Sequence, residues 1–95
     1  MGDSKDDAQA ALRSLPDLRG VYHHRKGGVY TLYSVSVDEG TSSTMVHYYS
    51  PSRDSRWTRT LADFTEEVEG RPRFWKVRGA NSEELLVATG LFGVR

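Results

Sequence analysis

Two adjacent glycines, Gly27 and Gly28, stand between two segments rich in aromatic and β-branched residues. Glycine adopts positive φ without steric penalty, and a glycine pair is typical of the tight turn in a β-hairpin. We therefore predict antiparallel strands over residues 21–24 and 29–37, joined by a turn that holds Arg25 and Lys26 in solvent.

The second of these strands predicts that the sheet curls. Toward its far end Val35 and Val37 alternate with polar residues, which gives one inward face. At its near end Tyr30 and Leu32 make the strand apolar on both faces. A strand that is covered on both sides at one end is typical of a curled sheet or a barrel.

The remaining chain continues the β pattern with one helical turn. Thr60 is placed to cap this turn, with Leu61 and Phe64 three residues apart on one side of it. In the last strand Phe74 and Trp75 alternate, so one is expected in the core and the other partly exposed. The predicted elements are strands over residues 44–50, 57–59 and 73–78, the helical turn at 60–64 and an acidic turn at 66–70.

Short helices are expected at both ends of the β segment. Pro16 ends the first helix, and Asn81 or Ser82 caps the second, which stops at Gly90. The predicted organisation is an N-terminal helix or mobile arm over residues 1–17, a β domain over 18–79, and a C-terminal helix and tail over 80–95.

Length and composition bound the function. A chain of 95 residues forms one domain, and its 13 basic and 13 acidic residues give a formal net charge of zero. Bulk charge therefore favours neither nucleic acid nor an anionic membrane. No apolar run approaches the roughly 20 residues of a membrane helix, and the absence of cysteine fits a reducing cytoplasm. We expect a cytoplasmic protein with no membrane partner.

The chain contains two signatures of aromatic, basic and apolar residues at fixed spacing. They are Tyr22-x-His24-x-Lys26-Gly27 and Trp57-x-Arg59-x-Leu61-x-x-Phe64-x-Glu66-x-Val68, the latter followed by Pro72-Arg73-Phe74. These signatures resemble those of a bacterial and phage group, domain-of-unknown-function family 1653. The chain departs from the family pattern at Thr60, where members usually carry proline. The resemblance implies a mostly β fold, a small SH3-like five-stranded antiparallel barrel with short flanking helices, and it supplies no activity.

Several chemistries find no support in the residue pattern. His23 and His24 are adjacent, so on a strand they point to opposite faces and do not share one metal ion. The serines after residue 49 lack a nucleophile motif, and Gly27-Gly28 lacks the context of a phosphate-binding loop. We expect no catalytic residue, no metal and no cofactor.

The stronger pattern joins aromatic and cationic side chains into a candidate ligand-binding site. Trp57 and Arg59 are two apart on one strand and therefore face the same side. An indole stacks on a planar ring, and a guanidinium pairs with phosphate or carboxylate. The competing interpretation makes Trp57 a core anchor and gives Arg59 a salt bridge to an acidic residue, Asp63 or Glu66. The candidate ligand-binding residues are Tyr22, His24, Lys26, Trp57 and Arg59.

Two function classes fit these residues. The preferred one is a non-catalytic binding module for a small anionic or nucleotide-like ligand. The alternative is an adaptor of SH3-like type for nucleic acid or for another protein, since single-strand binders combine basic grooves with stacking aromatics. The zero net charge and the acidic residues 63–69 count against a dedicated nucleic-acid binder. The oligomeric state is left open by the sequence.

Overall fold

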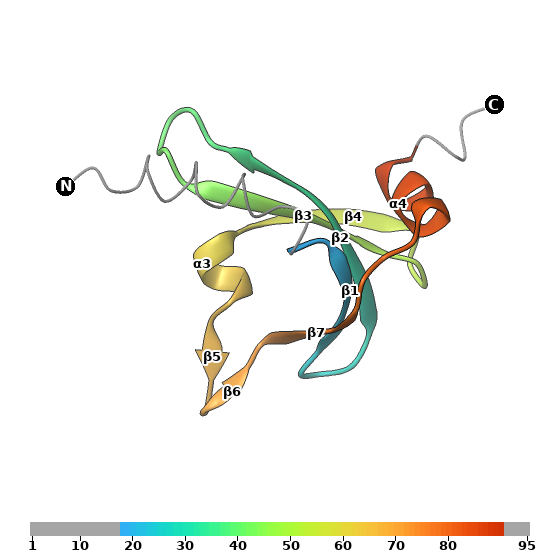
Figure 1. Cartoon of the computed structure of the whole chain (residues 1–95). Helices are drawn as coiled ribbons and strands as arrows, with labels where there is room; N and C mark the ends of the chain where they lie inside the picture. The colour runs from blue at the N-terminus through green and yellow to red at the C-terminus, as the bar shows by residue number, and fades with distance from the viewer. Residues whose placement is uncertain (1–17, 91–95) are drawn as a thin grey trace.

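The computed structural model describes residues 18–90 of the chain. Figure 1 shows a strongly curved main sheet, with α3 and the β5–β6 hairpin on one side of it and α4 on the other. The elements in chain order are β1 (Gly20–His24), β2 (Val29–Val37), β3 (Thr44–Ser50), β4 (Ser55–Thr60), α3 (Leu61–Phe64), β5 (Glu67–Val68), β6 (Arg71–Pro72), β7 (Phe74–Arg78) and α4 (Ser82–Thr89).

The main sheet is antiparallel and has five strands in the order β4-β3-β2-β1-β7. The predicted turn between its first two strands is confirmed, since Gly27 and Gly28 both have φ of 102°. Strands β4 and β7 are the two edges of the sheet, and within residues 18–90 no ladder joins them. The fold is therefore mostly β, and its hydrogen-bonded sheet is open.

The inner face of the sheet holds the core. Leu32 lies opposite Tyr48 and Val35 lies opposite Val46, although the two positions on β2 differ in parity. A β-bulge shifts the register between these pairs, so both residues of β2 face inward. Leu32 and Val46 are fully buried as a result.

Aromatic rings fill the rest of this core. Phe64, at the end of α3, stacks face to face on Phe74 of β7 with ring centroids 4.2 Å apart. Tyr22 meets Phe64 edge-on at 5.1 Å, and Tyr48 lies 5.5 Å from both phenylalanines. The helical turn of α3 is capped by Thr60 as predicted, and its Phe64 and Leu61 pack in the core on the inner face.

Helix α4 packs on the outer face, against β2 and β3. Asn81 and Glu84 form a capping box at its start, and Gly90 ends it with φ of 86°. Arg56 of β4 donates from Nε to the carbonyl of Ala88 at 2.6 Å and from Nη2 to that of Val87 at 2.9 Å. These bonds satisfy the final carbonyls of the helix and attach it to the sheet.

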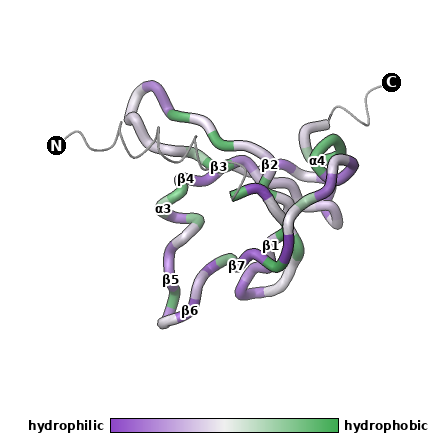
Figure 2. The backbone as a smooth tube through the Cα atoms, viewed as in Figure 1, coloured by the Kyte–Doolittle hydropathy of each residue, from purple (hydrophilic) through white to green (hydrophobic). Residues whose placement is uncertain are grey.

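The predicted elements correspond closely to those observed. Residues 66–70, predicted as an acidic turn, instead include strand β5, and only residues 69–70 form the turn of the small β5–β6 hairpin. The predicted N-terminal helix lies outside the described residues. Apolar residues are spread through the strands rather than gathered in one long segment (Figure 2), and no helix within residues 18–90 is long and apolar enough to cross a membrane.

The burial of the core predicts how two apolar truncations differ in their effect on stability. Leu32→Ala removes a fully buried side chain and leaves a cavity, so we expect it to lower the free energy of unfolding by about 2–5 kcal/mol. Val29→Ala, on the same strand but 44% exposed, serves as the control. We expect it to lower the free energy of unfolding by well under half of the loss in Leu32→Ala. Urea unfolding measures both, and equal losses would contradict the assignment of the core.

Candidate functional site

A hollow on the inner face, at the end of the sheet where β4 and β7 approach each other, collects aromatic and cationic side chains. Its volume is about 150 Å³. A larger hollow of about 400 Å³ between the β2–β3 turn and α3 is lined by hydroxyl and small apolar residues without charge or aromatic ring, and so carries no comparable chemistry. The residues that line the smaller hollow are His24, Tyr30, Tyr48, Arg53, Trp57, Arg59 and Phe74.

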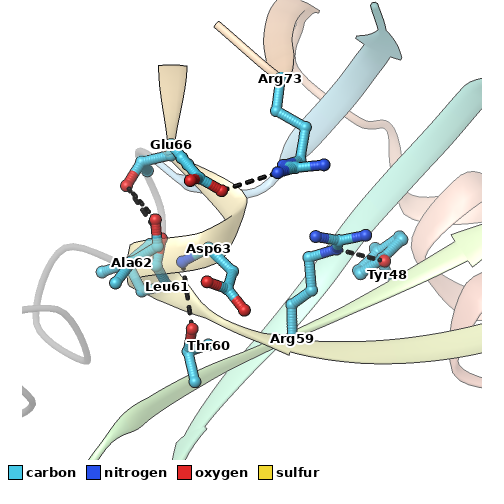
Figure 3. Close-up of polar contacts among 9 residues, drawn as sticks. Tyr48, Arg59, Thr60, Leu61, Ala62, Asp63, Glu66 and Arg73 are labelled. Carbon is cyan, nitrogen blue, oxygen red and sulfur yellow. Dashed lines mark hydrogen bonds and ion pairs between the residues drawn. The ribbon is translucent and has the colours of Figure 1, made fainter. Parts of the chain in front are cut away.

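Arg59 reaches into this hollow from β4. Its Nε donates to the hydroxyl of Tyr48 at 3.0 Å, and its guanidinium lies 5.7 Å from the ring centroid of Phe74. Within residues 18–90 no carboxylate forms an ion pair with it, because Glu66 accepts instead from Arg73 at 2.6 Å. Figure 3 shows Arg59 directed toward Tyr48 and Arg73 directed toward Glu66. The alternative salt bridge from Arg59 to an acidic residue is therefore not formed among the described residues. The hydroxyl of Tyr48 and the ring of Phe74 position its guanidinium instead.

Trp57 lies at the rim of the hollow. It pairs with Tyr48 across the β3–β4 ladder and faces the same side of the sheet as Arg59. Its side chain is 43% exposed, which argues against the interpretation of this residue as a core anchor. An indole face at the mouth of a cationic hollow is available for stacking on a planar ligand.

His24 enters the hollow from β1 with its protonation state set by its surroundings. Its Nδ1 accepts the backbone N–H of Lys26 at 3.0 Å, so this nitrogen carries no hydrogen and the neutral ring carries its proton on Nε2. Burial lowers the pKa of His24, and the positive charges of Arg59, Arg73, Lys26 and Arg25 lower it further. The hollow is therefore a region of positive potential that holds a neutral imidazole.

The structure brings three of the five predicted residues together and separates two. His24, Trp57 and Arg59 line the hollow. Tyr22 lies in the core at 8% exposure, with its hydroxyl donating to the carbonyl of Leu18 at 2.7 Å. Lys26 is exposed in the β1–β2 turn, outside the lining, and contributes its backbone N–H and its charge to His24.

Four of the lining residues lie outside the five candidate ligand-binding residues. Tyr30, Tyr48 and Phe74 were expected on strands, and only the register of the sheet sets them beside the predicted residues, with Tyr48 opposite Trp57. Arg53 lies in the β3–β4 turn, where no periodicity assigns a direction to its side chain. Knowledge of the cross-strand pairs would have placed these three aromatic residues in the hollow.

The aromatic and cationic residues around the last strand divide between two faces. Phe74 is buried in the core and Trp75 is 42% exposed, as the alternation predicted. Trp75 meets His23 edge-on at 6.0 Å on the outer face, while Arg73 pairs with Glu66. Arg73 and Trp75 therefore do not form one surface.

Comparison with known proteins agrees with the signatures in the sequence. The family model described as "Protein of unknown function (DUF1653)" matches residues 20–76, which include every residue that lines the hollow and all of the strands except the last two residues of β7. The chain belongs to the DUF1653 family. It is also similar to a crystal structure of a DUF1653 protein from Bordetella bronchiseptica, with a TM-score of 0.59 and 27% sequence identity over 66% of this chain and 90% of that chain. The search of curated proteins gave no match.

The electrostatics of the hollow predict a shift in the titration of His24. Arg59→Gln removes the positive charge that lowers the His24 pKa most, so we expect this pKa to rise toward its ordinary value. Titration of the imidazole by NMR measures the shift. Arg71→Gln, which removes a charge on β6 that is absent from the lining, is the control and leaves the pKa of His24 unchanged.

The same lowered pKa predicts a pH dependence of stability. The unfolded chain binds a proton more readily than folded His24, so the contribution of His24 to stability is complete above pH about 6.5 and is lost as pH falls toward its folded pKa. His24→Gln is expected to flatten this part of the stability profile. An unchanged profile in that variant would contradict the assignment.

Proposed function

We propose that this DUF1653 protein is a non-catalytic binding module for a small anionic, nucleotide-like ligand held in the hollow. The observation that carries the proposal is the pairing of an unneutralised guanidinium with an exposed indole on one strand. Within residues 18–90 Arg59 has no carboxylate partner, and Trp57 lies two residues away at the rim.

The arrangement assigns a separate role to each of these two side chains. The Nε of Arg59 is engaged by Tyr48, which holds the guanidinium in place and leaves its Nη groups to donate to phosphate or carboxylate oxygens. The exposed ring of Trp57 receives the planar part of the ligand by stacking. Because the guanidinium is already positioned, less side-chain freedom is lost on binding.

The size of the hollow limits what it encloses. Its volume of about 150 Å³ lies below the roughly 300–1,000 Å³ of sites that enclose a drug-sized ligand. The hollow therefore surrounds the charged end of a ligand, and the rest extends past Trp57 toward solvent.

We also propose that the curved sheet is an SH3-like barrel that is open between β4 and β7. The resemblance of the signatures to the family supports this architecture, as does the stacking of Phe64 on Phe74, which brings the two edges together through side chains. In this architecture the hollow is the gap in the barrel wall. A cytoplasmic location fits a protein without cysteine, and it belongs to the same proposal.

One observation favours the alternative of a nucleic-acid adaptor. Arg53 is exposed in the turn beside Trp57, so a single strand that leaves the hollow would meet a second cation. A steep fall of affinity with salt and tight binding of a single-stranded oligonucleotide would support this alternative over the small ligand.

Calorimetric titration with adenosine 5′-monophosphate and with inorganic phosphate tests the proposed function. Arg59→Gln is expected to abolish or strongly weaken binding of both probes. Trp57→Ala is expected to lower the affinity for the nucleotide by about tenfold, since stacking contributes about 1–3 kcal/mol per base. The affinity for inorganic phosphate is expected to stay nearly unchanged.

Matched controls separate binding from folding. Trp75→Ala removes an indole of equal exposure, 42% against 43%, from the outer face and is expected to leave both affinities unchanged. Thermal unfolding of each variant checks that the fold persists. If neither probe binds the unaltered protein, or if Trp75→Ala weakens nucleotide binding as much as Trp57→Ala does, the proposed site is wrong.

A further inference from the structure

We infer that the hollow selects a terminal phosphate monoester, the doubly charged end group of a mononucleotide, over the singly charged phosphodiester found inside a nucleic-acid chain. This inference rests on the proposed function and names the chemical class of its ligand.

The lining of the hollow carries positive charge that is not paired with a carboxylate of the lining. Two guanidiniums, those of Arg53 and Arg59, belong to it, and no carboxylate does. Neither of the two forms an ion pair within residues 18–90. The nearby Arg73 and Arg25 are each paired, with Glu66 at 2.6 Å and with Glu69 at 3.5 Å respectively, and neither belongs to the lining. A formal charge of two in the lining, counted from the two arginines, is neutralised by a phosphate monoester dianion and only half neutralised by a diester.

The second feature of the lining is its set of donors. The hydroxyl of Tyr48 accepts from Arg59 and therefore directs its own hydrogen elsewhere. His24 accepts at Nδ1, and its Nε2 has no partner among the described residues. With the Nη groups of Arg59, these side chains supply donors from three residues, two of them neutral, in addition to the guanidinium of Arg53. A phosphate monoester presents three strong acceptor oxygens, one more than the two unesterified oxygens of a diester.

The state of His24 fits this donor role. The groups that face its ring are the cations Arg59 from β4, Arg73 from the segment before β7, and Lys26 and Arg25 from its own turn. Together with the N–H of Lys26 at Nδ1 they favour the neutral ring with hydrogen on Nε2. His24 therefore donates one hydrogen bond without a change of protonation, and the charge of the ligand must come from its own ionisation.

Three probes that differ only in the group on the 5′ oxygen test the inference. They are adenosine 5′-monophosphate, its O-methyl ester and adenosine, titrated into the full chain at pH 7.5 and at pH 5.5. At the higher pH we expect the monophosphate to bind at least about tenfold more tightly than the methyl ester, the effect of losing one hydrogen bond to a charged oxygen. This advantage shrinks at pH 5.5, because the second phosphate pKa of a monoester is about 6. The methyl ester lacks this second ionisation, so its charge is the same at both pH values.

Arg53→Gln provides the matched variant, because Arg53 is exposed and its replacement leaves the core intact. It halves the formal charge of the lining and is expected to reduce the preference for the monophosphate over the methyl ester severalfold. Arg71→Gln changes the net charge of the chain equally, outside the hollow, and leaves that preference unchanged.

The outcomes distinguish this inference from the proposed function. Equal affinity for the monophosphate and the methyl ester, both lost in Arg59→Gln, would overturn the preference for a monoester and leave an anion-binding hollow. Absence of binding by both charged probes would overturn the preference and the proposed function together. A preference that rises at pH 5.5 would contradict the neutral donor role of His24.

Discussion

The stacking of Phe64 on Phe74 is the contact on which the rest of the molecule depends. Phe64 ends the helical turn that follows β4, and Phe74 begins β7, so the contact joins the two edges of an open sheet. No backbone ladder within residues 18–90 performs this role. The curvature of the sheet is therefore held by the packing of aromatic rings, whose burial contributes far more than a single hydrogen bond.

This way of joining the edges also accounts for the hollow. A closed ladder would place hydrogen-bonded backbone between β4 and β7, whereas side-chain packing leaves a gap that Arg59 enters. The guanidinium lies over the ring of Phe74, and Tyr48 supplies the hydroxyl that holds it. A cation supported by rings and a hydroxyl keeps its charge uncompensated, while one paired with a carboxylate, as Arg73 is, does not.

The outer face shows a different use of arginine. Arg56 neighbours Trp57 in sequence but points to the opposite face, where it binds the last carbonyls of α4 and lies over the ring of Tyr49 at 4.7 Å. Successive residues of β4 thus attach a helix on one side and line a hollow on the other. This division follows from the alternation of side chains along a strand.

The sequence by itself determined the local structure. The glycine pair predicted the first hairpin, the β-branched and aromatic runs predicted the strands, and Thr60 and Asn81 predicted where the helices begin, because each of these signals acts within a few residues. It also identified His24, Trp57 and Arg59 as candidate ligand-binding residues from their chemical types.

Only the tertiary structure decided which of the candidates meet. The bulge in β2 set the register that places Leu32 and Val35 in one core. The packing of the curved sheet put Tyr22 into that core, while Tyr30, Tyr48 and Phe74 came to line the hollow. The pairing of Glu66 with Arg73, rather than with Arg59, depends on the path of the chain through the β5–β6 hairpin. These outcomes depend on contacts between residues far apart in the chain, and no local pattern of side chains specifies them.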